Sequence, residues 1–190
     1  GTVNREQEWR LPRECRATLR RWERTLRPSG TRCVGRAAQR RPYNLFDLSQ
    51  GMLSALKKKF AEKDITLICD SYFDVPFGVS LFDCAVSVES LHHFTKEEKV
   101  PLYAKLHRAL KDGGYFVLTD YFSLSDEEEQ MHRQNLIALK AEQGIADDAF
   151  YHYDTPLTVK HETEALFEAG FSSVEVLKNW GATYTIKAVK

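Results

Sequence analysis

The sequence predicts an α/β fold in which a doubly wound, mostly parallel sheet is completed by a C-terminal antiparallel hairpin. From residue 43 onward, short apolar runs alternate with segments of helical periodicity. The apolar runs are continuous, which is typical of strands covered on both faces by helices. The 190 residues are 43% hydrophobic and include 11 Phe, 8 Tyr and 3 Trp, so one sizeable core can form, and the composition argues against global disorder.

Three strands and two helices are predicted in the first half of this pattern. The strands cover residues 43–46, 65–69 and 82–88. Ser49 can cap a helix that ends at residue 60. The apolar face of that helix is predicted to hold Met52, Leu53, Leu56 and Phe60. A second helix is predicted over residues 96–110, and the turn residues 112–114 are expected to end it.

The second half is predicted to contain another buried strand, two helices and the hairpin. The strand covers residues 115–119, and the helices cover 125–143 and 158–169. An aromatic-rich loop over residues 146–158 separates the two helices. Residues 171–180 and 183–189 then form the closing antiparallel strands.

Charge divides the chain into two segments. Residues 1–42 hold 12 Arg, no Lys and four acidic residues, a net charge of +8, whereas residues 43–190 carry −8. We therefore predict a basic, Arg-rich N-terminal segment over 1–42 and a separate domain over 43–190. Residues 13–26 have the spacing of a basic amphipathic helix. The alternative interpretation is that the Arg-only tract is aberrant, an out-of-frame reading of GC-rich coding sequence.

Membrane and metal-binding classes are not expected. No apolar run approaches the ~18 residues of a spanning helix, and no signal segment opens the chain, so we predict a cytoplasmic protein with no membrane partner. The cysteines show no CxxC or Cys/His ligand spacing, so free thiols and no metal are predicted. They are Cys15, Cys33, Cys69 and Cys84. The sequence does not indicate an oligomeric state.

Polar side chains follow three of the predicted strands. Asp47 and Asp70 follow the first two, and the segment 87–93 closes the third. In an open parallel sheet, ligands bind outside the carboxyl ends of the strands. One carboxylate there can accept hydrogen bonds from vicinal ribose hydroxyls, and a second can accept one from an exocyclic amine. The alternative is that both aspartates only begin the next loop or helix.

Five stretches occur in a characteristic order: LFDLSQGML at 45–53, CDS at 69–71 with VPF following, FDCAVS at 82–87, SLHHF at 90–94 and LKDGGYF at 110–116. Together they make residues 43–190 resemble class I S-adenosylmethionine-dependent methyltransferases. The resemblance implies a Rossmann-like fold and S-adenosyl-L-methionine as the cofactor.

The resemblance also implies roles for five residues. Asp47 would hold the ribose diol and Leu48 would flank the adenine. Asp70 would receive the adenine amine, with the Ser71 amide beside it. Ser87 would lie by the methionine portion of the cofactor.

One feature departs from the family. Its first strand ends in a glycine-rich GxGxG loop, where bare backbone lets the amino-acid portion of the cofactor come close. Upstream of residue 43 the sequence holds only Gly1, Gly30 and Gly35, so this loop is missing.

His92 and His93 are the candidate catalytic residues. A general base is needed only when the methyl acceptor must lose a proton, and a histidine at the end of the fourth strand of the family's sheet could supply it. The alternative is that the pair packs the loop over the cofactor. The aromatic residues Tyr151, His152, Tyr153, Trp180 and Tyr184 could line a lid over the substrate or pack within the fold.

The favoured function is therefore S-adenosylmethionine-dependent methyl transfer to a small-molecule acceptor. One alternative is an RNA methyltransferase that uses the basic segment 1–42 to contact phosphates, which would make nucleic acid a partner. Another is a non-catalytic binding module, because the glycine loop is absent. A nicotinamide dehydrogenase is disfavoured, because its fingerprint glycines are missing too.

Overall fold

A computed structural model describes residues 43–147, 149 and 151–190. The expectations for the basic segment, including its amphipathic helix and the glycines upstream of residue 43, lie outside these residues. Among the described helices, none combines the length and the apolar character needed to cross a bilayer.

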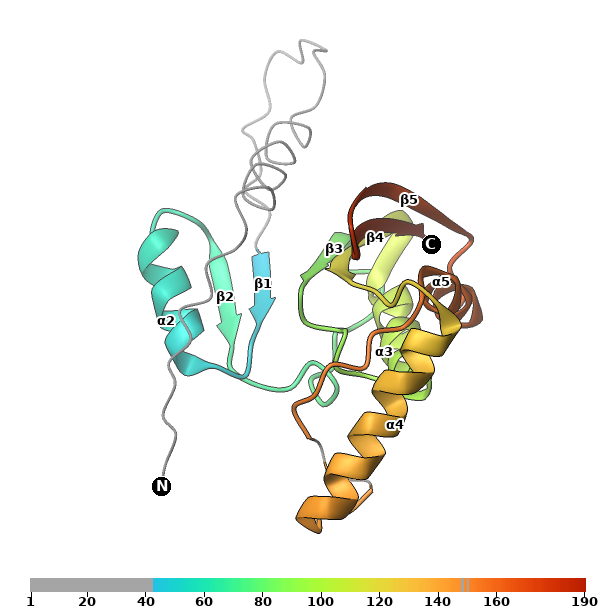
Figure 1. Ribbon diagram of the computed structural model, residues 1–190. Helices are drawn as coiled ribbons and strands as arrows, with labels where there is room; N and C mark the ends of the chain where they lie inside the picture. The colour runs from blue at the N-terminus through green and yellow to red at the C-terminus, as the bar shows by residue number, and fades with distance from the viewer. Residues whose placement is uncertain (1–42, 148, 150) are drawn as a thin grey trace, which may run out of the picture. The chain divides into compact units, whose positions relative to one another are not determined.

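The described strands form two sheets (Figure 1). The first pairs β1 (Tyr43–Phe46) with β2 (Ile65–Ile68). The second has the order β3-β4-β6-β5, with β3 at Phe82–Val88, β4 at Leu110–Tyr121, β6 at Thr183–Val189 and β5 at Ser173–Trp180. Strand β3 pairs with β4 in parallel, and β4–β6 and β6–β5 pair antiparallel. The C-terminal hairpin is thus confirmed, and the α/β, Rossmann-like class with it.

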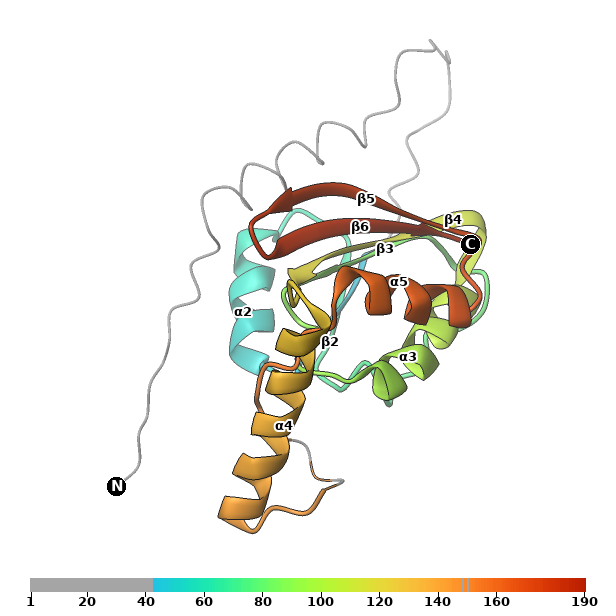
Figure 2. The same cartoon turned by 45° about the vertical axis from the view of Figure 1, so that its right-hand side comes forward.

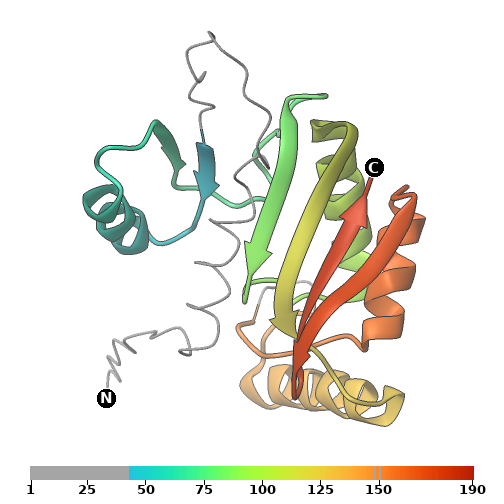
Figure 3. The same ribbon diagram turned by 90° about the horizontal axis from the view of Figure 1, so that it is seen from above.

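Within the described residues, four helices lie between the strands: α2 (Gln50–Lys59), α3 (Lys96–Ala109), α4 (Asp126–Gln143) and α5 (Val159–Glu168). Ser49, Ser125 and Thr158 cap α2, α4 and α5 by accepting hydrogen bonds from backbone N–H groups in the first turn. Helices α3 and α5 pack together and lie along one face of the four-stranded sheet (Figures 2 and 3).

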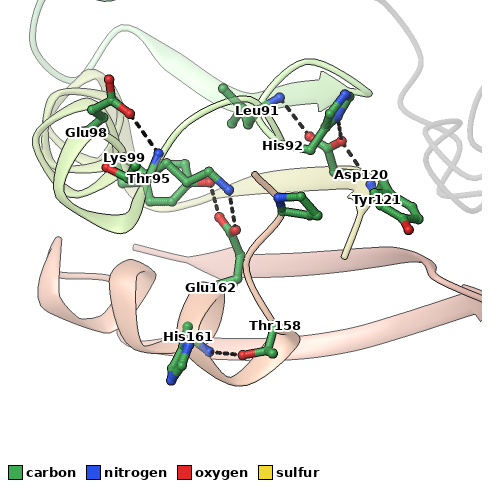
Figure 4. Close-up of polar contacts among 12 residues, drawn as sticks. Leu91, His92, Thr95, Glu98, Lys99, Asp120, Tyr121, Thr158, His161 and Glu162 are labelled. Atoms are coloured by element: carbon green, nitrogen blue, oxygen red, sulfur yellow. Dashed lines mark hydrogen bonds and ion pairs between the residues drawn. The ribbon is translucent and has the colours of Figure 1, made fainter. Parts of the chain in front are cut away.

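The core lies between that sheet and the α3–α5 pair. It is built from apolar side chains of all these elements, among them Tyr103, Leu110, Phe116, Leu166 and Ile186. Within it, the ammonium of Lys99 donates to Glu162 at 2.6 Å (Figure 4). The Tyr103 hydroxyl donates to the other oxygen of the same carboxylate. The three side chains are at most 2% exposed. A charged pair therefore links α3 to α5 inside the core.

Two local expectations are wrong. Residues 112–114 do not separate a helix from a later strand, because Leu110 already has the extended angles φ −73° and ψ 146° directly after α3. Strand β4 therefore begins at Leu110, and its register against β3 jumps between Phe82 and Cys84. Gly113, at φ +72°, allows this irregularity, since L side chains rarely adopt that angle.

The predicted apolar face of α2 is also only partly buried. Leu53 is 2% exposed, but Met52 is 54% exposed. The helical period is correct, but Leu53 is the residue of α2 that is buried.

The outer edge of β3 has no partner strand among residues 43–190 as described. Val86, in the middle of β3, is 61% exposed, although a buried parallel strand was expected there. Val86 therefore leaves apolar surface uncovered on one face of β3.

Candidate active site

Asp47 and Asp70 lie at the carboxyl ends of two neighbouring strands. The backbone N–H of Asp47 donates to the carbonyl of Ile68, the last residue of β2, at 3.2 Å, so the two strand ends are adjacent. The Oδ1 atom of Asp47 accepts from the Ser49 N–H, and that of Asp70 accepts from the Ser71 N–H, both at 2.7 Å. Each carboxylate keeps its Oδ2 without a hydrogen bond from any described residue. Both side chains can therefore accept from a ligand.

Leu48 and Ser71 flank these carboxylates. The Leu48 side chain is 70% exposed, and its carbonyl accepts from the Cys69 thiol at 3.6 Å. The Ser71 hydroxyl accepts from the Phe73 N–H at 3.2 Å, which begins a turn after β2. The Ser71 N–H already donates to Asp70, so it would have to exchange that partner to bind an adenine ring.

The ammonium of Lys105, on α3, holds the segment that follows Asp70. It donates to the carbonyls of Tyr72, Phe73 and Val75 at 2.6, 2.8 and 3.0 Å. It also lies 4.5 Å from the centre of the Phe77 ring. Lys105 therefore fixes the shape of the loop that carries the second carboxylate.

Tyr72 connects this loop to the loop after β3. Its hydroxyl donates to the carbonyl of Ser90 at 3.1 Å, and the Ser90 and Ser87 hydroxyls lie 3.2 Å apart. Burial, together with the charges of Asp120 and Asp47, raises the pKa of Tyr72 to about 12, so its hydroxyl stays protonated and can donate. Ser87 is thereby joined to the Asp70 loop through two hydrogen bonds.

Asp120, at the end of β4, is the functional candidate that the sequence did not reveal. It is 2% exposed, and its Oδ2 accepts from the Leu91 N–H at 2.8 Å. Its Oδ1 lies 2.5 Å from Nδ1 of His92 and also accepts from the Tyr121 N–H (Figure 4). The signal was available, because Asp120 follows the predicted strand 115–119 as Asp47 follows its own strand.

The contact with Asp120 determines the direction of the pKa shift and the tautomer of His92. Burial lowers its pKa, but the hydrogen bond and charge of Asp120, with a further contribution from Asp154, outweigh burial and leave the pKa raised. An imidazole that donates from Nδ1 to a carboxylate presents Nε2 as its acceptor atom. His92 is therefore oriented as a base of fixed tautomer.

His93 lies beside His92 and against the loop that precedes α5. The two rings have centroids 4.0 Å apart, and the His93 and His152 rings are 4.3 Å apart. Burial and the neighbouring His92 and His152 lower the pKa of His93. The Thr155 N–H donates to the carbonyl of His92 at 2.8 Å. Part of the expected aromatic lid, around His152, thus contacts the histidine pair.

Trp180 and Tyr184 lie on the C-terminal hairpin. Tyr184 packs edge-on against Phe122 at 5.5 Å between ring centroids. It is one of the partly buried residues that pack against the core. Its contacts are explained by packing.

The turn after β3 has an unusual backbone. Glu89 adopts φ +48°, a conformation that is uncommon for residues other than glycine, while its N–H donates to the Thr119 carbonyl at 2.8 Å. Such strained positions cluster at functional sites. The turn brings Ser87, Ser90 and His92 to the same edge of the sheet as Asp120.

The chain is similar to methyltransferases in sequence. Residues 32–114 match the family described as "Methyltransferase domain". A tRNA (carboxymethyluridine(34)-5-O)-methyltransferase, alkbh8, of Xenopus tropicalis is 30% identical over 115 residues, which are 60% of this chain and 17% of that protein. A carboxy-S-adenosyl-L-methionine synthase of Helicobacter hepaticus is 25% identical over 156 residues, 76% of this chain and 64% of that protein. The chain thus spans less than two thirds of either relative.

Solved structures share the fold. The YcgJ protein of Bacillus subtilis gives a TM-score of 0.59 at 14% identity, covering 79% of this chain and 82% of its own. Human N-acetylserotonin methyltransferase in complex with SAM gives a TM-score of 0.53 at 18% identity, covering 77% of this chain and 40% of its own. These identities are low, so the structural likeness speaks for the fold alone.

Proposed function

Because the chain belongs to the class I S-adenosylmethionine-dependent methyltransferases, we propose that it transfers a methyl group from S-adenosyl-L-methionine to a small-molecule acceptor. The observation that carries this proposal is the adjacent placement of Asp47 and Asp70 at the ends of β1 and β2. When bound, the cofactor supplies a sulfonium that is already an activated methyl donor.

The described residues fit the nucleoside part of the cofactor. Asp47 is proposed to accept from the two ribose hydroxyls, and Asp70 to accept from the adenine amine. Leu48 offers an exposed apolar side chain to one face of the adenine, with the Ser71 N–H nearby. Ser87, joined to the loop after β2 through Ser90 and Tyr72, is proposed to lie by the methionine portion.

His92 is proposed to take the proton of the acceptor when the acceptor must lose one. Asp120 holds Nδ1, so Nε2 is the atom that receives the proton, and the buried carboxylate stabilises the resulting imidazolium. A positioned base contributes typically ~10²–10⁴-fold to the rate. Alignment of the acceptor with the methyl group contributes more, up to ~7–11 kcal/mol of the barrier. His93 is proposed to orient His92 through the contact between their rings.

Charge favours a small molecule over RNA as the acceptor. Residues 43–190 carry a net charge of −8, which repels a polyanion. RNA is the second candidate, favoured by the similarity to a tRNA methyltransferase and by the +8 charge of residues 1–42. Salt-dependent RNA binding that disappears when residues 1–42 are deleted would decide for RNA.

The test is calorimetric titration of the full chain with S-adenosyl-L-methionine, followed by transfer of a radiolabelled methyl group to a panel of small hydroxyl and amine acceptors. We expect binding at one site, and transfer that falls at least ~10²-fold in His92→Gln while cofactor affinity is retained. Absence of both heat and thermal stabilisation at millimolar cofactor would instead identify a non-catalytic module that keeps the fold.

A further inference from the structure

Three donor atoms converge next to the proposed base. The Nε2 atom of His92 lies 3.6 Å from Oδ1 of Asp154, and Nδ1 of His93 lies 3.0 Å from the same oxygen. Each of the three residues offers one donor atom, and these atoms all lie within 4.8 Å of one another. They come from segments about 60 residues apart in the sequence, so the fold and not local spacing brings them together.

The distances suit a four-coordinate cation. Ligand atoms at ~2.0–2.2 Å from a tetrahedral Zn²⁺ stand roughly 3.3–3.6 Å apart. The separations of 3.0 and 3.6 Å lie close to this range, and the third pair of donor atoms lies within 4.8 Å. Small side-chain rotations would therefore bring the three atoms onto one ion, with a fourth position left for water.

The surroundings of the two histidines supply a second, independent observation. Asp120 accepts from Nδ1 of His92 and leaves Nε2 toward Asp154, the arrangement by which carboxylates orient histidine ligands of metals. The Nδ1 atom of His93 is buried and lies 3.0 Å from Oδ1 of Asp154 without the geometry of a hydrogen bond. A cation would satisfy this atom.

The negative charge at the cluster is compatible with the binding of a divalent cation. With both imidazoles neutral, Asp154 and Asp120 place two negative charges at the cluster, one in direct contact and one behind His92. Imidazole nitrogen and carboxylate oxygen are ligands that Zn²⁺ accepts in this number.

We propose that His92, His93 and Asp154 bind a divalent transition-metal ion of the Zn²⁺ class. The bound ion occupies Nε2 of His92, which is the atom that would receive the acceptor's proton, and so inhibits methyl transfer. The proposed metal binding depends only on the geometry of these three residues. The proposed inhibition of methyl transfer depends in addition on the proposed function.

The decisive variant is Asp154→Asn, because Asp154 acts on the proposed base only through its charge and its side chain is 55% exposed. Asp147→Asn is the matched control, an exposed aspartate on the same connecting segment. Full-length proteins are titrated calorimetrically with Zn²⁺, and with Co²⁺ by visible absorption. We expect one Zn²⁺ per chain for the original protein and Asp147→Asn, and affinity at least ~10-fold weaker for Asp154→Asn and His93→Gln.

Thermal unfolding without metal checks that the variants fold. Equal Zn²⁺ affinity for the original protein and Asp154→Asn would overturn the site. A Co²⁺ spectrum dominated by thiolate bands that vanish in Cys69→Ser would overturn it too, because it would assign binding to a cysteine.

Methyl transfer provides the second readout. With each protein compared with its own metal-free rate, Zn²⁺ should inhibit the original protein and Asp147→Asn, with recovery after a chelator, and should inhibit Asp154→Asn much less. Zn²⁺ binding without inhibition would overturn the inhibitory role. If no variant transfers methyl groups, the proposed function fails while the calorimetric comparison still decides the metal site.

Discussion

The two sheets present the carboxylates at their strand ends in opposite ways. On the β1–β2 pair, Asp70 is exposed and Asp47 half-buried, and each uses one oxygen on a nearby backbone N–H. On the four-stranded sheet, Asp120 is 2% exposed, and its oxygens are engaged by Leu91, His92 and Tyr121. The first two aspartates are therefore available to a ligand, whereas Asp120 shapes the protein's own site. We therefore expect mutations at the strand ends of the β1–β2 pair to affect ligand binding, and mutations of buried charged residues in the larger unit to affect folding.

The largest effect is expected in the core beneath the four-stranded sheet. Glu162→Ala leaves the Lys99 ammonium buried without its partner and should reduce the free energy of unfolding by about 3–5 kcal/mol, measured by urea denaturation. Replacing both residues, Lys99→Met with Glu162→Leu, should restore part of the loss, because the buried Tyr103 hydroxyl still lacks its acceptor. Glu164→Ala on the same helix, whose partner Lys96 is at the surface, should cost under ~1 kcal/mol. Equal losses at Glu162 and Glu164 would contradict the distinction between core and surface.

A binding effect without a folding effect is expected at the β1–β2 pair. Asp47→Ala should weaken S-adenosyl-L-methionine by about 1.5–3 kcal/mol in calorimetry, because hydrogen bonds to a charged group are lost. Its unfolding free energy should stay nearly unchanged, since among the described residues the side chain bonds only the Ser49 N–H. Asp64→Ala, at an exposed position before β2, is the control and should bind normally. Unchanged affinity in Asp47→Ala would remove Asp47 from the cofactor site.

A smaller binding effect is expected at Lys105, which links the two regions. Lys105→Met keeps the aliphatic stem but loses the bonds to three carbonyls of the loop after Asp70. We expect about 1 kcal/mol weaker cofactor binding and faster amide exchange in residues 71–77, followed by hydrogen-exchange mass spectrometry. Lys63→Met, at an exposed site after α2, should change neither.

The smallest effect concerns pH and His107. Burial, followed by the charge of Lys190, lowers the pKa of His107 in the folded state. The unfolded state therefore binds more protons between the lowered pKa and about 6.5, so this residue makes stability fall as pH drops through that window. His107→Gln should lose part of this dependence, seen as a shallower decline of the thermal midpoint from about pH 7.5 to about pH 5. An identical slope in the two proteins would contradict it.

Most elements were predictable because each carries a local signal. The apolar runs located all six described strands, and the capping residue Ser49 located the start of α2. The beginning of β4 at Leu110 was not predictable, because the register jump against Phe82 depends on a partner strand nearly 30 residues away.

The candidate site was predictable only in part. The positions of Asp47 and Asp70 follow from the rule that parallel strands end at one edge. The contact of His92 with Asp120 joins residues 28 positions apart, and Asp154 reaches the histidines from a loop with no periodicity. The cofactor roles of Asp47, Leu48, Asp70, Ser71 and Ser87 and the catalytic role of His92 and His93 stay predictions.

The Tyr72 hydroxyl has a thermodynamic consequence. It ties the loop that carries Asp70 to the Ser90 carbonyl, two residues before His92. If ligand binding at Asp70 favours one arrangement of this bond, a second ligand beside His92 encounters a different population of the Ser90 loop. The affinities of the two ligands then change by the same factor in both directions, because coupling between sites is reciprocal. The Tyr72 hydroxyl would thus determine how strongly binding of the methyl donor and binding of the methyl acceptor affect each other.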